Sequence, residues 1–299
     1  MKPAPFGGAF AGRRVLVTGH TGFKGAWLCL WLEALGARVS GYALAPDTEP
    51  SLFAQSGLAA RVDSELGDVR DAARLAACVR RVRPEVVIHL AAQPLVRRAY
   101  REPAETFAVN VMGGVNLLEA LRESPDTRVC VFVTTDKVYD ELGEGGPYAE
   151  ADPLGGREPY GASKACAEHV AAAWRASFLA PRGLSLSTAR AGNVIGGGDW
   201  AEDRILPDCV RALAAGKPVP LRHPESVRPW QHVLEPLSGY LLLAARQLQD
   251  PSAYSEAWNF GPAGAQDLPV SGLADLAVQA WGSGSWTHAP DGGPREAPS

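Results

Sequence analysis

Two short segments carry hydroxyl, carboxyl and amine groups that could perform acid–base chemistry. In the first, VCVFVTTDKVYD, an apolar run is followed at once by Thr134, Thr135, Asp136 and Lys137. Polar residues after a strand often do no more than begin a solvent-exposed loop. The carboxyl ends of parallel strands, however, are where α/β proteins bind their ligands. We therefore expect this strand end to deliver them into an active site, with Thr135, Asp136 and Lys137 as candidate catalytic residues.

The second segment, YGASK, pairs a phenol with an amine. Tyr160 and Lys164 are four residues apart, so both lie on one face of a helix that Pro159 is placed to open. A nearby ammonium lowers the pKa of a phenol from about 10 and makes the phenolate available as a base. Because YxxxK also occurs by chance in many chains, it carries weight only beside a nucleotide-binding loop.

Such a loop is indicated by VTGHTGFKGAW, where three glycines are spaced GxxGxxG between a predicted strand and a predicted helix. Glycines there let backbone N–H groups approach a pyrophosphate at a helix N-terminus. The alternative is a plain glycine turn, but the position after the first strand favours a dinucleotide site. We expect this loop to hold the cofactor through Gly19, Thr21, Gly22, Phe23, Lys24 and Gly25.

The third predicted strand ends at Asp68 and Val69, where the carboxylate could bond an adenine amino group. A solvated loop aspartate is nearly as good an interpretation. No carboxylate ends the second predicted strand, so the ribose criterion that separates NAD from NADP gives no answer.

Residues 204–232 form a locally basic segment, with five Lys or Arg against two acidic residues, in a chain whose net charge is −4. Arg228 in RPWQHV is the best candidate for a diphosphate contact, because a guanidinium binds phosphate oxygens in pairs. A solvated surface is the other interpretation, and it suits Arg211 and Lys217. His232 fits a ligand contact and a packed histidine equally well.

The elements that must position these residues alternate between strands and helices. Strands are predicted at 13–19, 38–44, 65–69, 85–92, 129–135 and 184–192, and helices at 23–35, 71–83, 103–122 and 159–178. The continuous apolar strands indicate a parallel sheet covered on both faces. After residue 190 the pattern weakens, with a helix at 234–248 and a strand at 258–262.

We therefore predict an α/β fold with a Rossmann-like, doubly wound parallel sheet. The dinucleotide-binding domain covers 1–185 and also receives segments near 228–262. A smaller, mixed lobe over 186–299 binds the second ligand.

Composition narrows the class of protein. The chain of 299 residues is 46% hydrophobic and 21% charged, and its acidic balance argues against a nucleic-acid binder. Its five cysteines form no CxxC pair, which favours reduced thiols in the cytoplasm, and no metal site is predicted. No apolar run is long enough to span a bilayer, so we expect a soluble protein without a membrane partner.

Together, the glycine loop, the threonine after the fifth strand and the YxxxK pair resemble the extended short-chain dehydrogenase/reductase family. In that family the loop holds NAD(P), and a Thr or Ser, the Tyr and the Lys act on a sugar hydroxyl. Thr135, Tyr160 and Lys164 match those positions. The resemblance adds to the expected cofactor site Leu90, Ala91, Ala92, Asn110, Thr134, Tyr160 and Lys164.

Six sequence blocks narrow the resemblance to the family's nucleotide-sugar dehydratases that act on CDP-glucose. These blocks are GHTGFKGAWL, AAQPLVRRAY, TTDKVY, YGASKACAE, RAGNVIGGGDWAEDR and RPWQHVLEPLSGYL. It implies NAD as cofactor, a CDP-glucose substrate and a homodimer formed by the helices at 159–178 and 103–122. It also implies substrate contacts by Gln93, Asn193, Arg204, Arg228 and His232.

The implied reaction oxidises C4 of the sugar, removes water across C5–C6 and returns hydride to C6. Tyr160 is the expected base in the first step, with Thr135 as its hydrogen-bonding partner. Asp136 is the expected acid in the elimination if burial raises its pKa. Lys137 is the C5 base only if desolvation lowers its pKa well below about 10.4, and otherwise it orients its neighbours.

Two other kinds of protein remain open. The chain could be another nucleotide-sugar dehydratase or an epimerase, although epimerases of this family tend to have small residues after the threonine. It could also be a non-catalytic nucleotide sensor, but the intact set of Thr135, Tyr160 and Lys164 argues against that. Family members continue beyond GPREAPS, so we expect a C-terminally shortened lobe. The product is expected to supply deoxysugars of surface polysaccharides.

Overall fold

The core of the protein is a parallel sheet of seven strands. The computed structural model describes residues 4–140, 147–262 and 268–293. The strand order is β11-β6-β5-β4-β1-β2-β3, and every neighbouring pair is parallel. The strands are β1 (Arg14–Thr18), β2 (Arg38–Ala43), β3 (Asp63–Leu66), β4 (Val86–His89), β5 (Val129–Val133), β6 (Ser185–Ala191) and β11 (Ala257–Phe260).

The chain order reverses at β1, which lies between β2 and β4. In open parallel sheets a crevice forms at the carboxyl edge beside such a reversal, and ligands bind there. The predicted Rossmann-like α/β fold is therefore confirmed.

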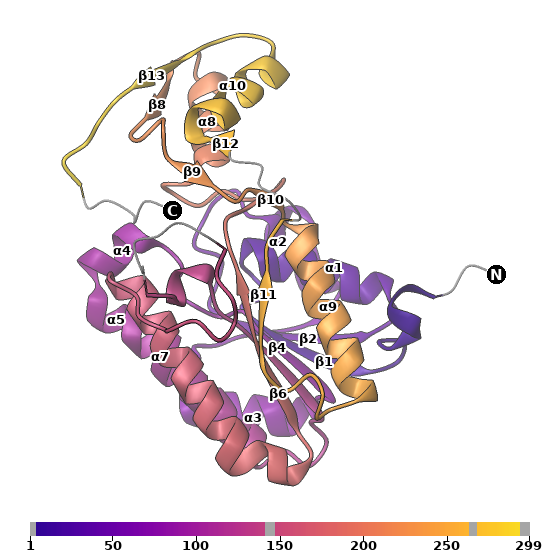
Figure 1. Cartoon of the computed structure of the whole chain (residues 1–299). Helices are drawn as coiled ribbons and strands as arrows, with labels where there is room; N and C mark the ends of the chain where they lie inside the picture. Colours follow the sequence, from indigo (N-terminus) through magenta and orange to yellow (C-terminus); the bar gives the residue numbers. More distant parts are fainter. Residues whose placement is uncertain (1–3, 141–146, 263–267, 294–299) are drawn as a thin grey trace.

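Helices cover both faces of the sheet (Figure 1). One face carries α1 (Phe23–Ala34) and α9 (Leu234–Gln249), and the other carries α3 (Ala72–Val82), α6 (Gly113–Arg122) and α7 (Pro159–Trp174). Along β1, Val15 and Val17 pack into the first layer and Leu16 into the second. This two-sided burial explains the continuous apolar strands.

The helix predicted at 103–122 is interrupted. It consists of α5 (Pro103–Phe107), a π-helical turn (Ala108–Met112) and α6. The π-helical turn widens the backbone at Asn110, and such turns are frequent at functional sites. The third strand also differs from the prediction, because β3 ends at Leu66 and leaves Asp68 and Val69 in the following loop.

A smaller lobe lies above the carboxyl edge of the sheet (Figure 1). It contains α8 (Ile205–Ala214), α10 (Val270–Trp281) and three short strand pairings. β8 (Val219–Leu221) pairs with β13 (Trp286–His288), β9 (Val227–Arg228) with β12 (Leu268–Pro269), and β7 (Val194–Ile195) with β10 (Gln231–His232). The chain leaves the main sheet after β6 and returns to it through α9 and β11.

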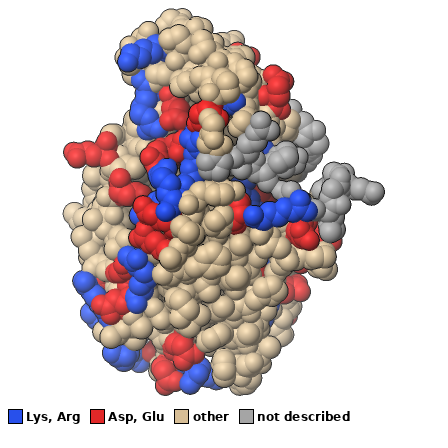
Figure 2. Space-filling view, turned by 90° about the vertical axis from the view of Figure 1, so that its left-hand side faces the viewer, with Lys and Arg blue, Asp and Glu red and all other residues tan. Residues whose placement is uncertain are grey.

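Ion pairs cross the junction between the lobe and the main sheet domain. Arg97 in α4 (Val96–Arg101) pairs with Asp203 at 3.4 Å and with Asp291 at 2.7 Å. Figure 2 shows acidic and basic side chains interspersed along this junction. In the described part of the chain, no helix is both long and apolar enough to cross a membrane.

Candidate active site

The glycine loop between β1 and α1 forms a cradle of bare backbone. Gly19 has φ of +78°, and a Cβ there would lie 2.7 Å from the backbone N of Ala91. Gly22 caps α1 without a side-chain cap, and an added Cβ would meet only the carbonyl oxygen of Gly19 within 4 Å. The helix N-terminus is therefore open to a ligand, and the loop fits the pyrophosphate of a dinucleotide.

Side chains on both sides of this cradle are fixed to the sheet. The hydroxyl of Thr21 donates to the carbonyl of Leu44 at 2.8 Å. The buried ring of His20 lies against Gly41, with its Nε2 2.7 Å from the Ser64 hydroxyl, and burial lowers its pKa to about 4. Neither residue brings a charge to the loop at neutral pH.

The loop after β3 provides an ionised carboxylate. Asp68 pairs with Arg70 at 2.6 Å, and hydrogen bonds from Arg70 lower its pKa. Val69 is buried and would collide with any side chain at Gly113. Asp68 is partly exposed and can still accept a hydrogen bond from a ligand.

The segment after β4 runs beside the cradle. Leu90 and Ala91 approach Gly19 through their backbones, and Leu90, Ala91 and Ala92 are all half-buried. Gln93, in contrast, is almost fully buried, and its side chain binds Thr106 and the backbone N of Leu95. The structure thus directs the Gln93 side chain into the protein.

Asn110 joins three parts of the fold from its π-helical turn. Its Oδ1 accepts from the backbone N of Gln93 at 2.8 Å, and its Nδ2 donates to the Gln93 carbonyl and the Ser163 hydroxyl. Ser163 in turn donates to the carbonyl of Tyr160 at 2.7 Å. Asn110 therefore positions the segment after β4 against the first turn of α7.

Tyr160 and Lys164 lie on α7 with their side chains buried. Glu158 caps this helix by accepting from the backbone N–H groups of Tyr160 and Gly161. The amine of Lys164 donates to the carbonyl of Val133, at the end of β5, at 3.1 Å. This hydrogen bond joins α7 to the end of β5 at Lys164.

The titration of this pair corrects the simple expectation from sequence. Burial raises the pKa of Tyr160 to about 12, and the Thr135 hydroxyl and Arg204 oppose this only in part. Burial also lowers the pKa of Lys164 to about 8, and the charge of Glu168 opposes that effect. Desolvation therefore outweighs the lowering of the phenol pKa that was expected from Lys164.

Thr135, Asp136 and Lys137 follow β5 in a single helical turn (Asp136–Val138). The Thr135 hydroxyl donates to Asp136 Oδ1 at 3.0 Å and accepts from the backbone N of Lys137 at 3.4 Å. Burial raises the pKa of Asp136, while Lys137, Thr135 and Arg228 act in the opposite direction. The shift has the direction that was expected for an acid at this position.

Thr134 points away from these groups. Its hydroxyl donates at 2.5 Å to Glu168, which lies one turn after Lys164 on α7. Glu168 forms a buried ion pair with Arg190 of β6 at 2.9 Å and also accepts from Thr188 at 2.7 Å. The Thr134 hydroxyl thus belongs to the support beneath the site.

The small lobe contributes cations at the carboxyl edge. Arg204 immediately precedes α8, and its charge acts on both Tyr160 and Lys24. Arg228 of β9 is buried, donates to the carbonyl of Val227, and acts on Asp136. Two cations of the small lobe therefore act electrostatically on Tyr160 and Asp136.

Two other predicted substrate residues lie on the chain that joins the lobes. Asn193 is half-buried between β6 and β7, and its carbonyl accepts from the backbone N of Gln231. His232 of β10 is exposed, and its Nδ1 accepts from the backbone N of Leu234 at 3.3 Å. This exposure removes the packed-histidine interpretation of His232.

Sequence reasoning missed three residues of this site, namely Tyr240, Glu168 and Arg190. The hydroxyl of Tyr240 accepts from Lys24 at 3.1 Å, although the two residues are 216 positions apart. No local pattern indicates such a contact. Glu168 could have been found, because its spacing of four from Lys164 places both on one helix face.

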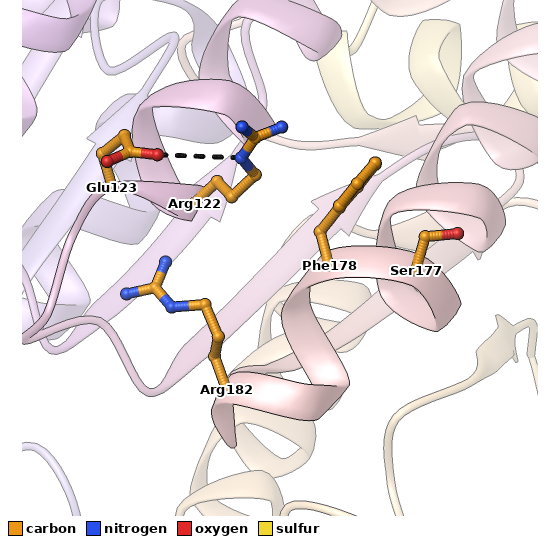
Figure 3. Close-up of a pocket in the computed structure, with 5 residues that line it drawn as sticks. All are labelled: Arg122, Glu123, Ser177, Phe178 and Arg182. Carbon is orange, nitrogen blue, oxygen red and sulfur yellow. Dashed lines mark ion pairs between the residues drawn. The ribbon is translucent and has the colours of Figure 1, made fainter.

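A separate surface pocket of about 500 Å³ lies away from this site (Figure 3). It is lined by Arg122, Glu123, Ser177, Phe178 and Arg182. These residues come shortly before β5 and β6 in the chain, near the amino ends of the two strands. The pocket therefore lies at the opposite edge of the sheet from the glycine loop. Among the described residues, no group of three or more His, Cys, Asp or Glu side chains could hold a metal ion.

Comparisons with known proteins agree with this geometry. A family model described as the NAD dependent epimerase/dehydratase family matches residues 15–261. The chain is 48% identical over 292 residues to a CDP-glucose 4,6-dehydratase of Salmonella typhimurium, with 96% of this chain and 81% of that protein covered. It is 33% identical over 232 residues to a dTDP-glucose 4,6-dehydratase of Xanthomonas campestris pv. campestris, with 73% and 64% covered.

A solved structure has the same architecture. The dTDP-glucose 4,6-dehydratase DesIV from Streptomyces venezuelae, crystallised with NAD and TYD bound, gives a TM-score of 0.79 at 27% identity. The alignment covers 93% of this chain and 84% of that chain.

Proposed function

We propose that this chain, which belongs to the NAD dependent epimerase/dehydratase family, is a CDP-glucose 4,6-dehydratase that uses NAD. The observation that carries the proposal is the pair Asp136–Lys137, which directly follows Thr135 at the end of β5. An acid with a raised pKa beside the Tyr160 site serves an elimination that simple oxidation does not need. The 48% identity to a CDP-glucose enzyme, against 33% to a dTDP-glucose enzyme, supports the choice of nucleotide.

The bare backbone of the glycine cradle fits a dinucleotide such as NAD. The backbone at Gly19, Gly22 and Gly25 would hold the pyrophosphate, and Asp68 would hold the adenosine end. When bound, NAD accepts hydride from C4 of the sugar and later returns it to C6. The domain that holds it is proposed to comprise 1–185 and the returning segments near 228–262.

Tyr160 acts in the first step by taking the proton of the C4 hydroxyl. Because the pKa of Tyr160 is about 12, its phenolate is disfavoured in the resting site. Positive charge from Lys164 and Arg204 is therefore needed to stabilise the phenolate when Tyr160 gives up its own proton. The Thr135 hydroxyl holds the phenol and the sugar oxygen in line. The product of this step is a C4 ketone, which acidifies the hydrogen at C5.

The second step removes water from C5 and C6. Asp136 donates a proton to the departing C6 hydroxyl, while a base takes the C5 proton. Lys137 is adjacent and is the candidate for that base or for its orientation. The resulting C5–C6 double bond then accepts hydride at C6 and a proton at C5, which gives CDP-4-keto-6-deoxyglucose.

The small lobe over 186–299 is proposed to hold the nucleotide diphosphate of the substrate. Arg204 and Arg228 supply positive charge beside the catalytic turn, and Asn193 and His232 line the chain that connects the lobes. A guanidinium suits this task because it binds two phosphate oxygens at once. These residues are therefore expected to govern substrate KM rather than cofactor affinity.

We also propose that the protein is a cytoplasmic homodimer whose product supplies deoxysugar biosynthesis. On α7, the exposed residues Cys166, His169, Ala172 and Ala173 form one stripe, and Met112 near α6 is also exposed. Ala165 lies on the same helix but is buried within the molecule, so it is not part of this stripe. Small residues at 172 and 173 would permit close helix approach.

Incubation with four nucleotide sugars tests the function. CDP-, UDP-, GDP- and dTDP-glucose are each mixed with protein and NAD, and a 4-keto-6-deoxy product is followed by its mass and ultraviolet absorbance. CDP-glucose is expected to turn over much faster than the other three. A 4-epimer without loss of water would identify an epimerase, and binding without turnover would identify a sensor.

A further inference from the structure

Gly192 is the residue at which the chain leaves the main sheet, and its bare Cα lies against the carboxylate of Asp136. It directly follows β6 and is half-buried. A Cβ at this position would lie 2.7 Å from Asp136 Oδ2 and 3.0 Å from the Cγ of Pro229, which follows β9. Even attractive C–H···O contacts keep the carbon about 3.3 to 3.6 Å from the oxygen. A methyl group at residue 192 therefore requires the carboxylate to move.

The backbone at Gly192 does not itself require glycine. Gly19 and Gly156 have positive φ values, which side chains rarely tolerate, but Gly192 is not among the glycines with positive φ. Alanine could therefore adopt the same local backbone and would add only its methyl group. What glycine provides at this position is space, and the Asp136 carboxylate borders that space.

The turn that carries Asp136 is also tightly packed against α7. A Cβ at Gly161, in the first turn of that helix, would lie 2.7 Å from the carbonyl oxygen of Lys137. The Asp136 side chain is fixed as well, because the Thr135 hydroxyl donates to its Oδ1 at 3.0 Å. With the backbone of the turn packed in this way, a methyl group at residue 192 is accommodated by rotating the carboxylate away from its bond with Thr135.

We propose that Gly192 is a positioning residue for the elimination step, because its bare Cα leaves room for the Asp136 carboxylate in the orientation that donates a proton. This inference rests on the proposed function, which makes Asp136 the acid. In that step a base takes the C5 proton, the C5–H electron pair forms the C5–C6 double bond, and the C6–O bond breaks. The departing oxygen takes the proton of Asp136 and leaves as water. Oxidation at C4 uses Tyr160 instead, so it does not depend on Gly192.

Single-turnover kinetics with saturating CDP-glucose and NAD separate the two steps, because NADH forms in the first and is consumed after the second. Gly192→Ala is expected to form NADH at the wild-type rate and to consume it at least about tenfold more slowly, since a general acid contributes about 10²- to 10⁴-fold in rate. Gly197→Ala is the matched control. Gly197 also lacks a positive φ, and a Cβ there would meet nothing within 4 Å, so wild-type kinetics are expected.

A double variant shows whether Gly192 acts through the acid. Once Asp136→Ala has removed the carboxylate, adding Gly192→Ala is expected to slow the consumption of NADH no further. The double variant should also fold if Gly192→Ala alone does not, and circular dichroism checks this. Wild-type consumption of NADH or slower formation of NADH in folded Gly192→Ala, an additive loss in the double variant, or failure of the double variant to fold overturns the inference. A wild-type protein that forms neither NADH nor a 4-keto product contradicts the proposed function instead.

Discussion

At the scale of single residues, burial dominates the chemistry of the site. It raises the pKa values of Tyr160 and Asp136 and lowers that of Lys164. Each shift favours the neutral form of the group, since a low-dielectric environment penalises charge. Burial therefore makes ionisation of Tyr160 and Asp136 less favourable than it is in water.

Tyr160→Phe removes only the proposed base. The ring remains packed against α4, where Val96 and Ala99 form a small buried cluster with it, so the fold should be kept. We expect cofactor affinity close to that of the wild type and kcat lowered at least about a hundredfold, because general-base catalysis is lost. Steady-state kinetics and NAD titration measure both quantities, and near-normal turnover would contradict the assigned role.

Asp136→Asn should separate the two chemical steps. The asparagine keeps the hydrogen-bonding shape but cannot give a proton to the C6 hydroxyl. We expect hydride transfer from C4 to proceed and the reaction then to stall with reduced cofactor and a 4-keto hexose bound. Single-turnover absorbance of NADH detects this state, and a variant that binds substrate but never forms NADH would place Asp136 in the oxidation step.

Asp136 also makes the folded protein less stable as pH rises. Its folded pKa lies above its unfolded value of about 3.9, so the folded state binds the proton more strongly, and stability falls as pH rises from the unfolded to the folded pKa. The Asp136→Asn variant has no carboxyl group to ionise, so it does not lose this stability as pH rises. Its melting temperature should exceed that of the wild type by a few degrees at pH 7.5, with a smaller difference at pH 4.5; an equal or lower value at pH 7.5 would refute this.

At the scale of elements, a buried hydrogen-bond network links the segments that carry the proposed catalytic residues. Glu168 accepts from Thr134, Thr188 and Arg190, and Arg190 donates to the Tyr139 hydroxyl at 2.8 Å. Tyr139 lies just after the Asp136–Val138 turn, and Glu168 lies one turn after Lys164. The network therefore fixes the turn after β5 in relation to α7.

Glu168→Ala leaves Arg190 buried without its carboxylate. We expect the free energy of unfolding to fall by about 3 to 5 kcal/mol, as for other broken buried ion pairs, and kcat to fall with it. Denaturant titration measures the loss. Glu202→Ala, which breaks the exposed pair with Arg101 at 2.9 Å, is the matched control and should change little; equal effects of the two substitutions would contradict the positioning role.

Most elements of the main sheet domain could be predicted from sequence, because buried parallel strands have continuous apolar runs and glycines mark the first turn. The π-helical turn at Asn110 could not, since its residues continue the helical pattern of their neighbours. The strands of the small lobe are two or three residues long and too short to show a period. Contacts such as Lys24 with Tyr240 depend on tertiary packing and leave no local signal.

At the scale of the whole molecule, ion pairs join the small lobe to the main sheet domain. Arg97 and Arg222 both pair with Asp203, next to Arg204. Asp203 has φ of +58°, a left-handed conformation that is uncommon for residues other than glycine. Arg97 lies in the main sheet domain and Arg222 in the small lobe, so Asp203 is tied to both.

The proposed dimer can be tested on α7. Ala173→Arg places a long cation in the exposed stripe, while Ala180→Arg introduces the same change at an exposed position beyond the helix. We expect light scattering to give a dimer for the wild type and Ala180→Arg, and mostly monomer for Ala173→Arg. A monomeric wild type at micromolar concentration would refute the dimer.

The most direct test of the central claim follows one hydrogen atom. CDP-glucose carrying deuterium at C4 is incubated with the protein and NAD, and the product is examined by mass spectrometry and nuclear magnetic resonance. The account predicts a 4-keto sugar lighter by one water, with the deuterium now at C6. Deuterium that remains at C4, or a product that has kept its C6 hydroxyl, would contradict it.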